Sequence, residues 1–268
     1  MTNTVLAFVR RSSQPPFDTG TLFQVSDDSP RAEIPPPPWQ RLPDRPARRR
    51  RDPISREAIV AAAIALLDRD GYDALSMRAL ADQLGTGAAS LYWHVGSKDG
   101  LLDLVMDELI GEVTVPGADP ARWREQVKEV ARAQRAVCLR HPYIVRVSIG
   151  RIPLGPNALR LNERVLAIMR AGGLPPVLAV QGFLLLIEVI NGFTLDETGV
   201  SGDQEPADPA AQAEMAGMVS GYLKELPGDR FPNLIELAGE FALADNDERF
   251  DLLIDIFVDG LARRATAG

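Results

Sequence analysis

One stretch, from Ser76 to Lys98, restricts the possible structures of this chain more than any other. It reads SMRALADQLGTGAASLYWHVGSK. Ser76 is a suitable N-cap for one short helix, Gly85 allows a tight turn after it, and a second helix is predicted from Ala88 to Val95. Two short helices joined in this way are typical of a helix-turn-helix, in which the second helix enters the major groove of DNA. The stretch therefore predicts a DNA-reading element.

The residue types on the second helix suit contact with base pairs. Ala88, Ala89 and Ser90 are small, so methyl groups can touch thymine methyls and the serine hydroxyl can bond either type of base. Tyr92 and His94 can reach phosphates or bases. A lone histidine is more often a surface or capped residue, and it is the combination of residues that favours DNA.

Not every residue of the stretch is expected at the DNA. Leu80, Leu84, Leu91 and Val95 recur at helical spacing and are predicted to fill the core between the helices. For Trp93 two interpretations stay open, packing within the protein and contact with DNA.

The net charge of −8 argues at first against a nucleic-acid partner, but the charges are unevenly distributed. Residues 45–100 hold nine Lys or Arg against seven Asp or Glu, whereas residues 101–268 hold 16 against 25. A basic run, Arg48 to Arg51, lies just before the predicted helix-turn-helix. Because attraction to phosphates acts within a Debye length of ~8–10 Å, acidic residues elsewhere in the chain are compatible with DNA binding.

The first 52 residues are rich in proline and are expected to form a disordered N-terminal extension. A linker or a misassigned start is the favoured interpretation, and a peptide ligand for a proline-recognition module is the alternative. The basic run at 48–51 is open between two interpretations, a solvated tail and an arm for the minor groove.

Other classes of protein are disfavoured by composition. The chain has no run of 18 apolar residues and no secretory signal, so we expect no membrane segment and a cytoplasmic location. The single cysteine, Cys138, excludes an intrachain disulfide and a multi-cysteine metal site, and is expected as a small apolar residue on a helix.

Apolar residues recur at helical spacing from Ile54 to the end of the chain, which predicts an all-α fold. After the helix-turn-helix, Ser97 is expected to cap a longer helix, and five or six further helices follow. Their predicted starts are Asp119-Pro120, Pro142, Pro156, Pro175-Pro176 and residue 209, with a short piece over 234–243 and a last helix over about 247–264. Three parts are expected: an extension over 1–52, a DNA-binding domain over 53–113 and a C-terminal domain over 114–268.

The chain resembles the TetR family of bacterial one-component regulators, above all in ISREAIVAAAIALLDRDGYDALSMRALADQLGTGAASLYWHVGSKDGLLD. The string LYWHV at 91–95 is similar to the tetracycline-repressor branch, as are RVSIGRIP at 146–153 and QGFLLLIEVINGFTLDETG at 181–199. The resemblance implies an N-terminal three-helix helix-turn-helix domain followed by a helical effector-binding and dimerisation domain. It also implies a homodimer that binds a palindromic double-stranded DNA operator, one half-site for each protomer.

The resemblance carries over to particular positions. It implies that DNA is contacted by Arg78, Thr86, Gly87, Ala88, Ala89, Ser90, Tyr92, Trp93, His94 and Lys98. In this family the helix near 175–197 and the last helix pack against their dimer mates, and we expect Leu253 and Phe257 on that face. The alternative is burial of both helices within one chain; one face can serve the core and the other the partner.

The family's effector pocket lies among the helices of residues 100–195, and segment 141–153 is our candidate for the moving element. The candidate effector-binding residues are Trp123, Ser148, Arg151, Asn162, Met169, Phe183, Glu188 and Asn191. Glu188 and Asn191 are the most informative, since they are polar within a very apolar helix. Ser148 stands where the tetracycline-repressor branch has a histidine that helps to hold a magnesium–drug complex, so we expect no metal and no cofactor.

The sequence therefore predicts a DNA-binding transcriptional regulator, a repressor that an unknown small molecule releases from its operator. A regulator without a small-molecule effector, or one that activates, is the alternative. An all-α enzyme is the remaining class. His141, Ser148 and Glu188 are the residues that could form a triad, but no nucleophile elbow or phosphate-binding loop accompanies them.

Overall fold

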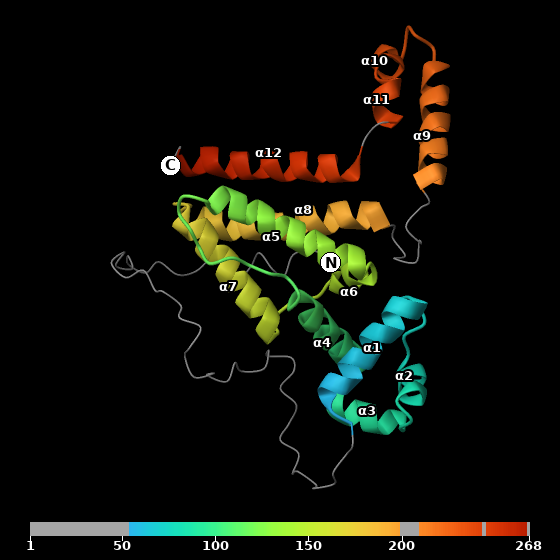
Figure 1. Ribbon diagram of the computed structural model, residues 1–268, viewed down its shortest axis with the longest axis vertical. Helices are drawn as coiled ribbons and strands as arrows, with labels where there is room; N and C mark the ends of the chain where they lie inside the picture. Colours follow the sequence, from blue (N-terminus) through green and yellow to red (C-terminus); the bar gives the residue numbers. More distant parts are fainter. Residues whose placement is uncertain (1–53, 199–208, 243–244, 267–268) are drawn as a thin grey trace. The chain divides into compact units, whose positions relative to one another are not determined.

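A computed structural model describes residues 54–198, 209–242 and 245–266, and within these ranges the regular elements are all helices. The expected disordered extension and most of the acidic loop after residue 198 lie outside the described residues. The helices shown in Figure 1 are α1 (Arg56–Asp70), α2 (Met77–Gln83), α3 (Ala88–Val95), α4 (Lys98–Ile110), α5 (Trp123–Arg140), α6 (Tyr143–Ser148), α7 (Pro156–Ala171), α8 (Pro176–Thr198), α9 (Pro209–Lys224), α10 (Pro232–Glu236), α11 (Ala238–Ala242) and α12 (Asn246–Thr266).

Helices α1 to α4 form the part that we call the head, and their starts are set by local chemistry. Ser55, Ser76 and Ser97 are the N-caps of α1, α2 and α4, and each hydroxyl accepts a hydrogen bond from the backbone N–H three residues along, at 3.1, 3.1 and 2.9 Å. Gly85, between α2 and α3, has a φ of +62°, a left-handed conformation that costs glycine little. The predicted positions of both short helices are confirmed.

The head and α6 share one hydrophobic core. It contains Leu80, Leu91 and Val95, as predicted, together with Leu101 of α4 and Tyr143 of α6. Leu84, which was also predicted for this core, is only partly buried and packs against the same cluster. Since helix α6 contributes to this core, the head is not an independent unit of packing.

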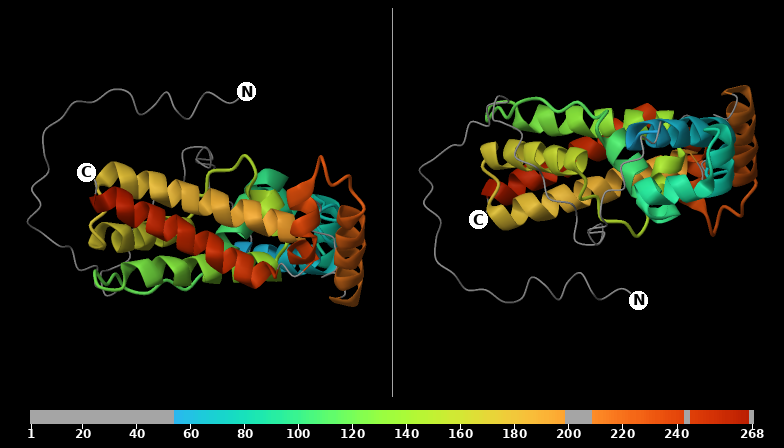
Figure 2. Two further views of the ribbon diagram at one scale, coloured as in Figure 1. Left: turned by 90° about the horizontal axis from the view of Figure 1, so that it is seen from above. Right: turned by 90° about the horizontal axis from the view of Figure 1, so that it is seen from below.

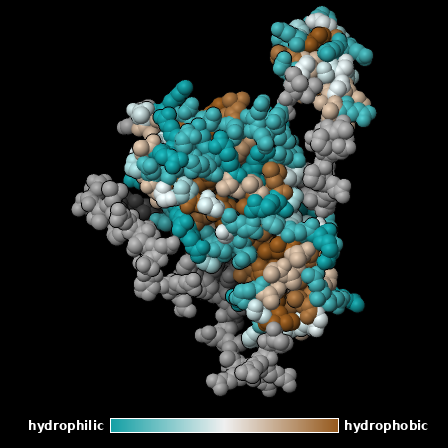
Figure 3. All heavy atoms as spheres, in the orientation of Figure 1, coloured by the Kyte–Doolittle hydropathy of each residue, from teal (hydrophilic) through white to brown (hydrophobic). Residues whose placement is uncertain are grey.

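Helices α5, α7, α8 and α12 surround a second core and form what we call the body, seen from two sides in Figure 2. Phe250 and Ile254 of α12, Ile190 of α8 and Ile168 of α7 are almost fully buried there. The visible face of α5 and α12 in Figure 3 is mostly hydrophilic. Surface ion pairs such as Lys128–Asp255 join these two helices on the outside (2.8 Å).

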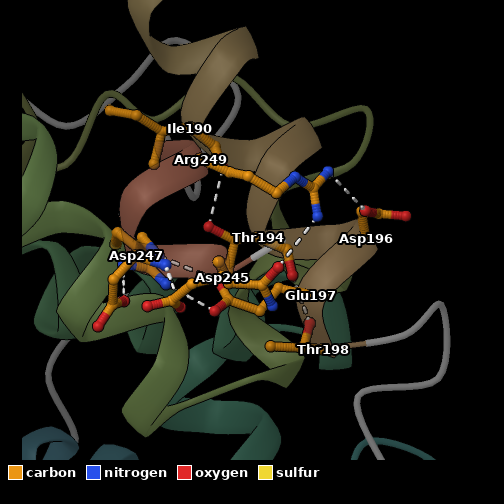
Figure 4. A network of polar contacts seen from close by, with 10 residues as sticks. Ile190, Thr194, Asp196, Glu197, Thr198, Asp245, Asp247 and Arg249 are labelled. Carbon is orange, nitrogen blue, oxygen red and sulfur yellow. Dashed lines mark hydrogen bonds and ion pairs between the residues drawn. The ribbon is translucent and has the colours of Figure 1, made fainter. Parts of the chain in front are cut away.

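A buried arginine joins α5, α8 and α12. Arg135 of α5 donates to both carboxylate oxygens of Glu197 on α8 (2.6 and 3.0 Å) and to Asp247 on α12 (2.7 Å). Figure 4 shows this region, where the hydroxyl groups of Thr194 and Thr198 bond carbonyl oxygens one turn earlier in α8. The polar groups at this end of the body are therefore paired, as burial requires.

Three expectations about the helices need correction. Helix α5 begins at Trp123 and not at Asp119, because the Asp119 carboxylate accepts from the N–H of Ala121 in a local turn (2.9 Å). Eight helices, not five or six, follow α4 in the described residues, and the short piece near 234–243 is two helices, α10 and α11. Both lie beside α9.

The outward faces of α8 and α12 also differ from expectation. Leu253 and Phe257 are partly buried, and Phe257 packs against the second core, whereas Leu252 and Ile256 on α12 are mostly exposed. Helix α8, despite having no apolar run of 18 residues, is long and apolar enough by composition to cross a membrane, and 33% of its most apolar window is buried. Since α8 packs on α5, α7 and α12, we assign it to the body.

Candidate functional site

Helix α3 presents one face to solvent and one to the core. Leu91 and Val95 are buried, whereas Ala89 is exposed, and Tyr92 and Trp93 have 47% and 62% of their surface accessible. Of the two interpretations of Trp93, packing in the core is therefore wrong, because its side chain is exposed, and contact with DNA stays a prediction. The exposed face of α3 combines a small residue with two large aromatic ones, which suits contact with base edges and phosphates in the major groove of DNA.

The other predicted DNA contacts surround this face to different degrees. Arg78 and Gly87 are exposed, and Thr86 and Ala88 are partly buried. Ser90 is partly buried, and its hydroxyl oxygen is enclosed without a hydrogen-bond partner among the described residues. This hydroxyl does not point to solvent here, so a contact between Ser90 and a base requires a change of rotamer.

Two further residues of the set have contacts within the head. His94 is partly buried, its ring lies edge-on to that of Trp93 (4.7 Å between centroids), and its carbonyl oxygen accepts from Arg56 (3.2 Å). The Lys98 ammonium donates to the carbonyl oxygen of Leu75 (2.6 Å). Lys98 therefore fastens the loop before α2, whatever contact it makes with phosphate.

Three basic residues in and around α6 contact carboxylates of the head, and we call these contacts the head–body joint. His141 Nδ1 lies 2.7 Å from the Asp68 carboxylate. Arg146 makes two bonds to Asp73, at 2.9 and 3.1 Å. The third residue is Arg151, which bonds Asp99 (2.6 Å) and Asp103 (2.7 Å), both on α4. These contacts were not predicted from the sequence.

Helix α4 is also attached to the start of α7. The buried Asp107 carboxylate accepts from the backbone N–H groups of Ala158 (2.9 Å) and Asn157 (3.3 Å), which are free donors at a helix N-terminus. A Cβ atom at Gly155 would collide with this carboxylate. Glycine at that position therefore lets the chain pass close to α4.

A cavity of about 110 Å³ lies between α4, α5, α6, α7 and α8. Five of the eight predicted effector residues line it: Ser148, Arg151, Asn162, Phe183 and Asn191. The rest of the wall is largely apolar and includes Met106 and Ile110 of α4, which the prediction missed, as it missed Gln134 and Cys138 of α5. The last two are four residues apart on one helix, a spacing that reveals a shared face.

The other three predicted effector residues are not among those that line the cavity. Trp123 is buried against Gly172, where a Cβ atom would collide with the indole ring. Met169 is fully buried in the second core. Glu188 is exposed. It directly follows Ile187 of the cavity wall, and the helical rotation between neighbouring residues turns it to the outer side of α8. A polar residue within an apolar helix is here a surface residue.

The polar groups of the cavity sit in a largely apolar setting. Burial raises the pKa of the Cys138 thiol to about 12, so the thiol is protonated at neutral pH and behaves as an apolar wall group. The Ser148 hydroxyl donates to the carbonyl oxygen of Val145 (2.7 Å). His141 pairs with the head and Glu188 lies outside, so the structure does not assemble these residues with Ser148 as a triad.

Family models match two parts of the chain. The model described as bacterial regulatory proteins, tetR family, matches residues 59–105. The model described as tetracyclin repressor-like, C-terminal domain, matches residues 115–265. These segments contain most of the head and of the body.

Individual proteins are similar to the chain over different lengths. A transcriptional regulator of Saccharopolyspora erythraea is 44% identical over 120 residues, 45% of this chain and about half (51%) of that relative's length. The transcriptional repressor DrrR1 of Streptomyces coeruleorubidus is 30% identical over 81% of this chain and 80% of its own. The crystal structure of the Streptomyces coelicolor TetR family protein ActR in complex with actinorhodin has a TM-score of 0.72 and 43% identity, over 80% of this chain and 99% of ActR.

Proposed function

Because the chain belongs to the TetR family of bacterial regulatory proteins, which are transcriptional regulators and not enzymes, we propose that it is a homodimeric repressor released from its operator by a small molecule. Residues 53–113 are the DNA-binding domain and residues 114–268 bind the effector and dimerise. The observation that carries the proposal is the cavity, because helix α4 forms part of its wall and is joined to the DNA-reading helix α3 by only Gly96 and Ser97. Cytoplasmic location follows from this function.

The DNA contacts that we propose are the ten residues of the sequence-based prediction, with the exposed ones first. Tyr92 and Trp93 present the largest accessible surface on α3, and Ala89 leaves room between them and the groove. Arg78 is exposed at the start of α2, where it can reach a phosphate. Operator binding by both protomers of a dimer requires two heads whose spacing matches successive half-sites.

The cavity indicates the class of ligand. Its wall is mainly apolar, with amides at Gln134, Asn162 and Asn191, a hydroxyl at Ser148 and the guanidinium of Arg151. We propose a largely apolar small molecule that carries carbonyl, hydroxyl or carboxylate oxygens, and the binding of actinorhodin by ActR supports this class. Four of these five side chains, all but Gln134, were among the predicted effector residues, and Phe183 is the fifth predicted residue that lines the cavity.

The size of the cavity links ligand binding to release. Pockets for drug-sized ligands have typical volumes of ~300–1,000 Å³, so a cavity of about 110 Å³ must expand to accept one. Expansion displaces the wall, including Met106 and Ile110 on α4, and α4 carries the head. A ligand that prefers the expanded state shifts the population away from the state that binds the operator.

The proposal is tested by selecting bound fragments from random DNA with the full-length protein, and by measuring the affinity for the selected site with and without actinorhodin. We expect a palindromic site, and a loss of affinity of about 5–150-fold when ligand is present. Tyr92→Ala should weaken binding to that site while circular dichroism and dimer mass stay unchanged. Selection of no site at all would contradict the proposal, and a site whose affinity no ligand in a broader panel alters would favour a regulator without an effector.

A further inference from the structure

Arg151 belongs both to the wall of the cavity and to the head–body joint. Its side chain lines the cavity, and its guanidinium bonds the carboxylates of Asp99 and Asp103 and the Asp99 carbonyl oxygen, all in the first two turns of α4. Its pairing with Asp103 is sheltered, since only 19% and 20% of the two side chains are accessible to solvent. Solvent therefore weakens this contact less than it weakens a surface ion pair.

The other two basic residues of the head–body joint, His141 and Arg146, do not line the cavity as Arg151 does. His141 pairs with Asp68 and Arg146 pairs with Asp73, but neither is among the residues that line the cavity. All three hold the head, and of the three only Arg151 can be reached by a ligand in the cavity.

We propose that Arg151 is the positioning residue that passes ligand binding to the head, because an acceptor oxygen of the ligand competes with Asp103 for its guanidinium. This inference rests on the proposed function and adds the residue through which it is regulated. A guanidinium remains charged and has a fixed fork of donors, so it must keep acceptors when it turns toward the cavity. Asp103, only 20% accessible, then loses its partner, and the start of α4 is released.

A carboxylate built into the cavity wall can replace the unknown ligand in a test. Ser148→Asp places one near Arg151, whose backbone N–H bonds the carbonyl oxygen of residue 148 (3.1 Å), and Ser148→Asn has nearly the same shape without the charge. Asn162→Asp also places a carboxylate in the cavity wall, and the unmodified protein, with its neutral Asn162, is the control for it. The readout is amide hydrogen exchange over residues 99–104 in the free, full-length protein.

We expect Ser148→Asp and Asn162→Asp to accelerate exchange over 99–104 at least about fivefold, the lower end of ordinary allosteric coupling, and Ser148→Asn to leave it unchanged. Adding Arg151→Gln should remove the difference between the Asp and Asn variants, whereas adding Arg146→Gln should preserve it. Equal exchange in the Asp and Asn variants, or a difference that persists without Arg151, would overturn the inference. Should Ser148→Asp fail to fold, the Asn162→Asp comparison decides alone.

This experiment uses neither DNA nor ligand, so its outcome is separate from that of the proposed function. If no operator is found but exchange follows Arg151, the proposed function fails while the connection between cavity and α4 stands. If an operator and a ligand are found but exchange does not depend on Arg151, the repressor remains and the transmitting residue is another one.

Discussion

Charged side chains in and around α6 pair with the head beside the apolar core that the two share, whereas α8 and α12 present apolar side chains on their outer faces. On the first surface lie the three basic residues of the head–body joint, each with its closest carboxylate oxygen 2.6 to 2.9 Å away. On the second lie the exposed residues of what we call the outer rows: Val177, Val180, Leu184, Leu252 and Ile256.

We infer from this difference that the contacts of the head–body joint can change, whereas a contact made by the outer rows should stay fixed. Partly exposed ion pairs contribute about 0–1 kcal/mol each and can exchange one acceptor for another, which suits a head that must move. Burial of apolar area stabilises by roughly 25 cal/mol per Å² and depends on close packing, which suits a permanent partner. Since proteins of this family dimerise, we assign the outer rows to the dimer interface.

The largest expected effect comes from placing charges in the outer rows. Leu184→Glu combined with Ile256→Glu should give folded monomers, because two carboxylates without partners in an apolar interface cost several kcal/mol each. Sedimentation velocity measures the oligomeric state. Ala61→Glu, at an exposed position of α1, adds the same charge elsewhere and should leave the dimer intact. A double variant that still sediments as a dimer would remove the interface from α8 and α12.

Inside the body, a buried ion pair should behave unlike those of the joint. Arg135→Ala should lower the free energy of unfolding by about 3–5 kcal/mol, because the Glu197 carboxylate, only 13% accessible, loses its arginine partner. Arg132, which pairs with Asp251 at 2.8 Å, is the matched control: both side chains are about half exposed, and Arg132→Ala should cost only ~0–1 kcal/mol. Urea unfolding gives both values, and equal losses would refute the distinction.

The attachment of α4 to α7 should tolerate substitution less well than the ion pairs of the head–body joint do. Gly155→Ala should lower the free energy of unfolding by about 1–3 kcal/mol, since the added methyl group collides with the Asp107 carboxylate. Gly117→Ala, where a Cβ atom has no neighbour within 4 Å, should be nearly neutral. Thermal unfolding of both variants measures the difference, which disappears if the Asp107 contact does not constrain the chain.

The smallest effect is expected at the joint itself. Arg146→Gln removes the bonds to Asp73, whose side chain is 70% exposed, and should lower global stability by no more than ~1 kcal/mol. The same variant should accelerate hydrogen exchange in α1 and α2 more than in α8. A loss of several kcal/mol would show that the joint is as rigid as the body.

The head could be predicted from sequence almost to the residue, and the reason is locality. Ser55, Ser76 and Ser97 bond N–H groups three residues away, so the signals that set the helices lie within the helices themselves. The family resemblance also rests on this segment. The exposed state of Trp93 could not be predicted, because periodicity left it between the core face and the surface of α3.

The cavity and the joint depend on contacts between distant residues. Arg151 and Asp103 are 48 residues apart, and Arg146 and Asp73 are 73 apart, so no local pattern reveals them. Residue type alone placed Glu188 in the pocket, and the rotation of α8 placed it outside. Leu253 and Phe257 were chosen for the outer face by the same reasoning, and packing against α5 and α8 turned their neighbours Leu252 and Ile256 outward instead.

The central claim, a mobile head on a fixed dimeric body, is tested most directly by pulsed electron paramagnetic resonance on spin-labelled dimers. Labels at Asp82→Cys on α2 and at Arg160→Cys on α7 report the two parts separately, and the buried Cys138 thiol, with its pKa of about 12, stays unlabelled. On addition of the ligand that releases the operator, the head-to-head distance should change while the distance between the two bodies stays the same. A body distance that changes as much as the head distance, or a head distance that does not change while DNA is released, would contradict the account.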